Sequence, residues 1–282
     1  LGASAITSSY RYRRRFGHFS DRAHFTPFPY CYRCPYDKVK DTCGAYCVSQ
    51  FEKLFETEYN SFWDPRAGEC EFGAIFAEPI QASGGVIVPP EGYLRRMAEV
   101  CRRHDILFVA DEVVTAFGRL GHWFASWDEF GVQPDIICMA KGISSGFPFA
   151  ALGTRRAFDE QWVTGSHSGS SNGNPIACAA ALATIEVLQE PGFAQRRFQR
   201  RHVDHHRGEV SCFHVGDELL HRFRRRRNTR FAAAGFGGDA DPHRLISLAL
   251  NVVREVPELM VSAGKSADFT AAWCVGGGTN VS

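Results

Sequence analysis

The hydrophobic pattern of the first two thirds of the chain is built from short apolar runs separated by amphipathic stretches. Residues 72–77, 106–110, 136–140 and 147–154 are rich in branched, aromatic or small apolar side chains, and each has the length of a strand. Continuous runs of this kind are typical of strands that are buried on both faces of a parallel sheet. The pattern therefore predicts a sheet of at least four strands.

Stretches with helical periodicity lie between and beside these runs. The helix that should join the first two runs has apolar side chains at a 3.6-residue period: Leu94, Met97, Ala98 and Cys101. Two further helices are predicted over residues 43–59 and 176–189, the second of which follows an Asn-Pro pair that is typical of a helix start. A strand, a helix and a second strand form a βαβ unit with a right-handed crossover. These elements predict an α/β fold with a mostly parallel sheet flanked by helices.

Two of the predicted strands end in side chains that could carry chemistry. Asp111 follows residues 106–110, and Lys141 follows residues 136–140. In open α/β sheets ligands bind beyond the carboxyl ends of the strands. A lysine at such a place is partly desolvated, which frees its amine to form a Schiff base, while a buried acid needs a cationic partner such as a protonated pyridine. This pair favours a pyridoxal phosphate site, although a capping or ion-paired Asp111 and a surface Lys141 would fit many other folds.

Several separate motifs carry a resemblance to a known family. Residues 111–119, the Pro-Asp-Ile at 134–136 and the Ala-Lys-Gly at 140–142 resemble the class III (fold-type I) pyridoxal phosphate-dependent aminotransferases, 4-aminobutyrate aminotransferase-like enzymes above all. The resemblance covers residues 1–190 and implies that this part is an incomplete cofactor-binding large domain. It also implies transamination between an amine or omega-amino acid and a 2-oxo acid, in a homodimer with shared active sites.

The resemblance assigns a role to each candidate site residue. Lys141 would carry pyridoxal 5'-phosphate and act as the catalytic base, Asp111 would pair with the pyridine nitrogen, and Val113 would pack on the ring. Gln81 would donate to the phenolic oxygen and Glu78 would shape the substrate pocket, unless Glu78 only caps nearby amides. Ser170 would reach the phosphate of the neighbouring subunit, unless its serine-rich loop has no such role.

Four departures from the family pattern leave an inactive relative as the alternative. Alanine stands at residues 82 and 116, where the family has glycine, and a positive φ at residue 82 would strain an alanine by about 1 kcal/mol. The glycine-serine phosphate cup and the ring-stacking aromatic, which the family has upstream of this segment, do not occur in the chain. We therefore expect an N-terminally truncated protein, which is either an active aminotransferase or a catalytically inactive form.

Composition and charge exclude several other classes. The formal net charge is +1 and 22% of the residues are charged, so no overall field indicates nucleic acid or a membrane surface. No apolar stretch is long enough to cross a bilayer, and the N-terminus lacks a signal-peptide pattern. Ten cysteines in a chain of this size favour free thiols in a reducing cytoplasm over a disulfide framework.

Four cysteines in the first part of the chain are spaced closely enough to suggest a metal site. Cys31, Cys34, Cys43 and Cys47 could form a zinc site, but the last two begin an amphipathic run, so no metal is predicted.

Residues 191–282 replace periodic apolar positions with arginine clusters and are predicted to be a divergent or disordered region in place of the small C-terminal domain. An altered reading frame would explain the shift. The arginine clusters could instead form a basic tail that binds nucleic acid. A solvated run is favoured over that hypothesis because the clusters lack a regular spacing of aromatic residues.

Overall fold

The computed structural model describes residues 2–19, 22–57, 61–163, 172–191 and 269–272. Ser170 and nearly all of the predicted divergent region, including its arginine clusters, lie outside these ranges. The chain divides into two compact units, of which the first comprises Leu1–Ile75 and Ile87–Leu107. The second comprises Phe76–Val86 and Phe108–Ser282. Every described candidate site residue belongs to the second unit.

Short helices dominate the first unit. Its elements are α1 (Gly2–Ile6), α2 (Tyr10–Arg13), the 3-10 helix η1 (Cys31–Arg33), α3 (Tyr46–Lys53), the antiparallel pair β1 (Trp63–Asp64) and β2 (Glu69–Cys70), and α4 (Tyr93–Arg103). The apolar positions predicted for α4 are all buried, which confirms that helix. Helix α3 begins three residues later than predicted because Gly44 and Ala45 have left-handed φ values of +58° and +57°. It also ends earlier, at Lys53, where the chain turns.

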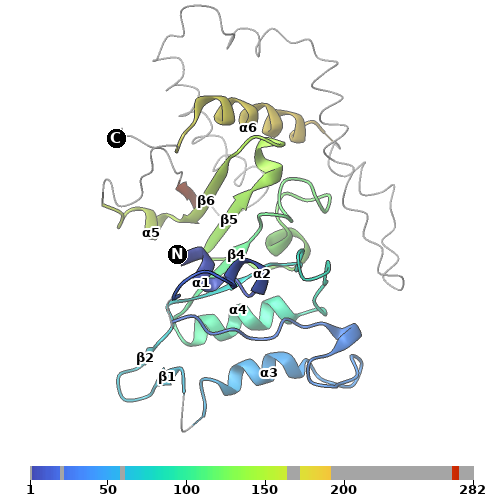
Figure 1. The fold of residues 1–282 in the computed structure, drawn as a ribbon, viewed down its shortest axis with the longest axis vertical. Helices are drawn as coiled ribbons and strands as arrows, with labels where there is room; N and C mark the ends of the chain where they lie inside the picture. The colour runs from blue at the N-terminus through green and yellow to red at the C-terminus, as the bar shows by residue number, and fades with distance from the viewer. Residues whose placement is uncertain (1, 20–21, 58–60, 164–171, 192–268, 273–282) are drawn as a thin grey trace, which may run out of the picture. The chain divides into compact units, whose positions relative to one another are not determined.

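A five-stranded sheet follows the order β3-β4-β5-β6-β7. Its strands β4, β5 and β6 are labelled in Figure 1. Its strands are β3 (Ala74–Ala77), β4 (Leu107–Asp111), β5 (Ile136–Ala140), β6 (Ala150–Arg155) and β7 (Phe269–Ala272). Strands β4 and β5 are parallel, whereas β5 and β6, and β6 and β7, are antiparallel. The α/β class is as predicted, and the sheet is mixed because β6 returns beside β5. Residues 108–110 of β4 are at most 2% exposed, as expected for a strand covered on both faces.

Asp135 fixes the start of β5 against β4. Its Oδ2 accepts from the Phe108 N–H at 2.7 Å, and its own N–H donates to the Phe108 carbonyl at 2.8 Å. Oδ1 of the same carboxylate pairs with Arg155 at the end of β6, 2.8 Å away. One largely buried carboxylate therefore holds three strands in register.

The remaining elements lie around the strand ends. They are the π-helical segment η2 (Ala125–Glu129), the 3-10 helix η3 (Lys141–Ser144), α5 (Arg156–Asp159) and α6 (Pro175–Leu188). Helix α6 is confirmed at its predicted start, where the Asn174 side chain accepts from the N–H groups of Ile176 and Ala177. It packs against η3. At about 1.5 Å per residue α6 is about 21 Å long, and none of the described helices could cross a bilayer.

Candidate active site

Asp111 and Lys141 emerge at the same edge of the sheet. Strands β4 and β5 are parallel, and the register places Asp111 opposite Cys138, three residues before Lys141. The Glu112 N–H donates to the Cys138 carbonyl at 3.0 Å, which extends the pairing one residue past Asp111. The two strand ends predicted to act together therefore lie side by side (Figure 1).

Asp111 is half-buried and is held by its own turn. Its Oδ1 accepts from the Val113 N–H at 3.1 Å, so the backbone of the predicted ring-packing residue helps to orient the carboxylate. Val113 is itself half-buried. Burial raises the pKa of the neighbouring Cys138 thiol to about 11, and the Asp111 charge contributes to that rise. Asp111 thus sets a negative potential at the end of β4.

Glu78 follows β3 and lies close enough to Asp111 and Lys141 for their charges to affect its carboxyl group. Burial raises the pKa of the Glu78 carboxyl, and Asp111 raises it further, while the Ala82 N–H and Lys141 lower it. Oε2 of Glu78 accepts from the Ala82 N–H at 2.9 Å, so the capping contact considered as its alternative role exists. Ala82 does not have a positive φ, and the strain considered for alanine at this position is therefore not present.

Gln81 depends on a glycine three residues later. A Cβ atom added to Gly84 would collide with the carboxamide of Gln81. Gly84 therefore supplies the space that the Gln81 side chain fills, and any larger residue there would displace it. Gln81 is half-buried. This packing gives the carboxamide a defined place after β3.

Lys141 differs from its prediction in one respect: its side chain is exposed, so the described residues do not supply the expected desolvation. The physical reason is that the chain leaves β5 sharply at this point. Ala140 is extended, whereas Lys141 has a left-handed φ of +48° and opens η3. Such a conformation costs a non-glycine residue about 1 kcal/mol and is kept where the surrounding structure enforces it. A strained lysine at a strand end is typical of a functional position.

Gly142 explains how the strained turn is held. A Cβ at this glycine would lie 3.3 Å from Cβ of Phe117 and 3.5 Å from the Ala116 carbonyl oxygen. The backbone after Lys141 is therefore in close contact with the loop that follows β4. Phe117 also has a left-handed φ, of +58°, so each of the two segments that meet at Gly142 contains a strained residue.

Glu112 was not predicted to have a role, yet it is the most thoroughly bonded carboxylate in the described part of this unit. It is 0% exposed and accepts from the Thr115 hydroxyl, from the Ala125 N–H at 3.1 Å, and from the N–H and hydroxyl of Ser126 at 2.6 and 2.7 Å. A signal was available in the sequence, because side chains alternate across a strand and Glu112 must point away from the face of Asp111. An acid directed into a core needs donors, and Thr115 is three residues away.

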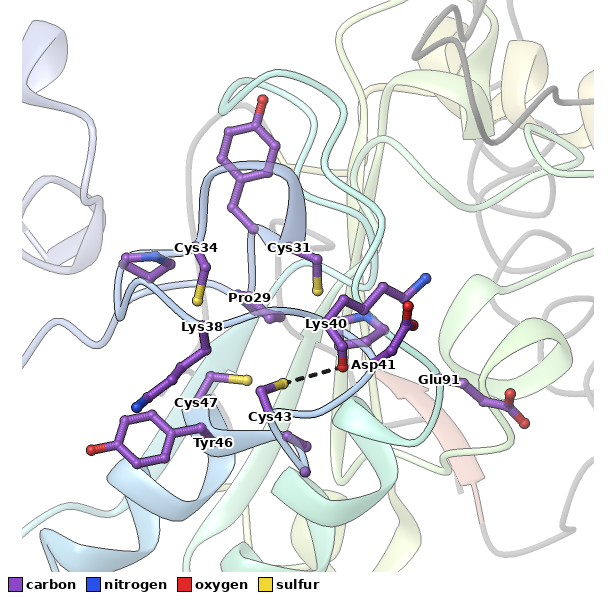
Figure 2. Close-up of a pocket in the computed structure, with 15 residues that line it drawn as sticks. Pro29, Cys31, Cys34, Lys38, Lys40, Asp41, Cys43, Tyr46, Cys47 and Glu91 are labelled. Atoms are coloured by element: carbon purple, nitrogen blue, oxygen red, sulfur yellow. Dashed lines mark hydrogen bonds between the residues drawn. The ribbon is translucent and has the colours of Figure 1, made fainter.

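The four cysteines considered for zinc line a separate cavity in the first unit (Figure 2). This cysteine pocket has a volume of about 280 Å³ and is also lined by Lys38 and Lys40, among others. Burial raises the pKa values of the Cys31 and Cys47 thiols, and nearby cysteines add to both shifts. Among the residues that the structure describes, no group of three or more histidine, cysteine or acidic side chains could hold a metal ion. The zinc alternative therefore has no coordinating geometry there.

Comparisons with known proteins agree with this arrangement. The family Aminotransferase class-III matches residues 1–203. The leucine/methionine racemase of Thermococcus litoralis is 40% identical over 196 residues, which is 69% of this chain and 42% of that protein. The 4-aminobutyrate aminotransferase of Mycobacterium leprae is 38% identical over 205 residues, 71% of this chain and 43% of that protein.

A solved structure gives the same result. The amine transaminase from an uncultivated Pseudomonas species, in its pyridoxal phosphate-bound form, superposes with a TM-score of 0.57 at 36% identity, covering 66% of this chain and 42% of that one. The chain thus spans less than half the length of these relatives. The sequence match, the shared fold and the strand-end residues lead to one conclusion: this chain belongs to the class III aminotransferase family.

Proposed function

We propose that the protein is a pyridoxal phosphate-dependent enzyme that transfers an amino group between an amine or omega-amino acid and a 2-oxo acid. The observation that carries the proposal is the convergence of Glu78, Asp111 and Lys141 at the ends of the three neighbouring strands β3, β4 and β5, in a family whose solved relative binds this cofactor. Membership of the family supports a homodimer. The eight described cysteines are all free thiols, which supports a reducing compartment such as the cytoplasm.

The residues at the strand ends fit the cofactor. The Asp111 carboxylate would pair with the pyridine nitrogen, and the Lys141 amine would hold the aldehyde carbon. Val113 would pack on the ring and Gln81 would donate to the phenolic oxygen, while Ser170, proposed for the phosphate, lies outside the described residues. When bound, pyridoxal phosphate accepts the electron pair of the substrate's breaking C–H bond.

The side chains of this chain then divide the remaining work. Lys141 would hold the cofactor until the substrate amine takes its place, and its free amine would then act as the base that removes the proton from the substrate carbon and as the acid that gives it back. The Asp111 carboxylate would pair with the protonated pyridine nitrogen. Glu78 would face the substrate, because its carboxyl is influenced by both Asp111 and Lys141. The exposure of Lys141 leaves its amine accessible for attack.

A cofactor titration of the purified chain tests this proposal. Adding pyridoxal phosphate should produce the absorbance band of a Schiff base, and borohydride should fix one cofactor on the peptide that contains Lys141. The Lys141→Ala variant should lose both signals and all turnover, whereas Lys38→Ala, which removes an exposed lysine of the other unit, should retain them. Retained turnover and an unchanged band in Lys141→Ala would refute the proposal, and no band in the wild-type chain would favour the inactive alternative.

Racemisation is a second candidate, which the 40% identity to leucine/methionine racemase favours. Both reactions begin with the same proton transfer at the substrate carbon, and they differ in the carbon to which the proton returns. Incubation with L-leucine or L-methionine and no oxo acid separates them. Loss of optical activity without formation of an oxo acid would indicate racemisation. Amino transfer instead requires the oxo acid and consumes it in equal amounts.

A further inference from the structure

Glu112 directly follows Asp111, the last residue of β4, and precedes Val113, the other residue of this segment that is proposed to contact the cofactor. Its backbone N–H pairs with Cys138 on β5, and its backbone carbonyl accepts from the Ala116 N–H at 3.1 Å. Its side chain is wholly buried. Glu112 therefore contacts β5 through its backbone and the following loop through its carboxylate.

The loop of residues 112–126 closes on this carboxylate. Four donors from three of its residues converge on the two oxygens: the Thr115 hydroxyl and the Ala125 N–H on Oε2, and the N–H and hydroxyl of Ser126 on Oε1. The Phe117 N–H donates to the Trp123 carbonyl at 2.9 Å and closes the loop further out. Burial raises the pKa of Glu112, and the hydrogen bonds from Thr115, Ser126 and Ala125 oppose that rise. A buried carboxylate with four donors is stable only while the loop keeps this shape.

The same loop contacts the turn that carries Lys141. Ala116 and Phe117 lie directly against Gly142, where no Cβ would fit without a shift. Phe117 is 3% exposed and is packed edge-to-face on Phe124, which precedes the donors Ala125 and Ser126. A path of contacts therefore runs from the Glu112 carboxylate to Ala125, through the adjoining Phe124 to Phe117, and from Phe117 to Gly142.

We infer that Glu112 is a positioning residue, which fixes the 112–126 loop and through it the relative placement of Asp111 and Lys141. The inference rests on the proposed function, because it assigns Glu112 to the support of the same cofactor site. Glu112 does not touch the cofactor in this assignment. It acts by holding the strained Lys141 turn in one conformation, and misplacement of a reacting group by about 1 Å can lower a rate about 100-fold.

The test compares Glu112→Gln with Glu129→Gln in the full chain. Glutamine keeps the size of Glu112 but presents an NH₂ group to donors. Glu129, at the end of η2 just after this loop, is exposed and makes a weak surface ion pair with His122, at 3.5 Å. At saturating pyridoxal phosphate and below the unfolding temperature, Glu112→Gln should slow Schiff-base formation on Lys141 about 10- to 100-fold. It should also speed amide exchange in both peptides, 112–126 and 138–146. Glu129→Gln should match the wild type in all three measurements.

A purely structural role would loosen the 112–126 peptide alone. Unchanged exchange over residues 138–146 together with wild-type Schiff-base formation would overturn the inference. If Glu112→Gln does not fold, Ser126→Ala removes one of the four donors and should slow Schiff-base formation several-fold with the same two-peptide signature. If the wild-type chain forms no adduct, the proposed function fails. The exchange of residues 138–146 then decides the positioning inference by itself.

Discussion

The cysteine pocket of the first unit and the strand ends of the second unit hold their polar groups in opposite ways. At the strand ends the carboxylates of Glu78, Asp111 and Glu112 each accept from a backbone N–H of a nearby turn. In the cysteine pocket the described hydrogen bond of a thiol is that of Cys43 to the Lys40 carbonyl at 3.4 Å, and burial favours the neutral form of Cys31 and Cys47. The pocket is hollow, and burial disfavours a charge on these two thiols.

This difference teaches where chemistry is to be sought in the molecule. A concave pocket is the default hypothesis for a ligand site. Catalysis, however, depends on groups that are oriented before the substrate arrives. In this chain the oriented carboxylates and the strained lysine lie at strand ends, and the cavity of about 280 Å³ lies among thiols. The following changes test whether the strand ends, and not the pocket, carry the activity.

The largest expected effect is that of Asp111→Asn. The substitution keeps the size of the side chain and its contact with the Val113 N–H but removes the charge that would hold a protonated pyridine. We expect turnover to fall about 100-fold or more, because a buried charge-assisted contact contributes about 3 kcal/mol. The matched change in the pocket is the triple variant Cys31→Ser, Cys43→Ser and Cys47→Ser, which should stay within about twofold of the wild type. Equal losses in both variants would remove the distinction between the two regions.

Asp135→Ala should have the next largest effect, on stability. It removes the acceptor of the Phe108 N–H and the partner of Arg155, so the free energy of unfolding should fall by about 2 to 3 kcal/mol. Urea unfolding measures this loss. Arg155→Met separates the two contacts, since the arginine is 43% exposed and its loss should lower the free energy of unfolding by less than about 1 kcal/mol. If Arg155→Met matched Asp135→Ala, the ion pair and not the backbone contact would hold the strands.

Gly142→Ala should cost less, about 1 to 2 kcal/mol of unfolding free energy, because the added methyl group meets Phe117 and the Ala116 carbonyl at 3.3 and 3.5 Å. The same shift should disturb Lys141 and slow Schiff-base formation more than stability alone would suggest. Gly73→Ala is the control, as nothing lies within 4 Å of its added Cβ. Calorimetry and the rate of cofactor attachment give the two readouts. A stable Gly142→Ala variant with a wild-type rate would show that this contact is not needed.

The strand ends could be predicted from sequence because they depend on local pattern. The apolar runs that end in Asp111 and Lys141 indicate two strands whose ends lie beside each other at one edge of the sheet. The helix start at Asn174 follows from its side chain and the proline after it. The exposure of Lys141 could not be predicted in this way. It arises from a left-handed φ of +48° at Lys141. Lysine is not one of the residue types that indicate such a conformation in a sequence.

The contacts of Glu112 show the second limit of prediction. Its partners Ala125 and Ser126 are 13 and 14 residues away, and only the folded loop brings them to the carboxylate. The antiparallel return of β6 is likewise a tertiary property, because an apolar run has the same pattern in either direction. Gly44 and Ala45 have left-handed φ values, which make α3 start later than predicted. The period of the apolar positions gives no information on these backbone angles. Local chemistry was predictable, and the loops that support it were not.

The smallest expected effect concerns the thiols and tests the other half of the comparison. Because burial raises the pKa values of Cys31 and Cys47, the thiolate fraction at pH 8 should be lower in the folded chain than in urea. Alkylation by iodoacetamide, followed on peptides by mass spectrometry, should therefore be several-fold slower in the folded chain, and the difference should shrink as pH rises above the ordinary thiol range. Lys40→Met should slow Cys31 further, since the Lys40 charge lowers the pKa of that thiol. Faster alkylation of Cys31 in the folded chain than in urea would mean that the pocket activates a nucleophile, and the contrast with the strand ends would not hold.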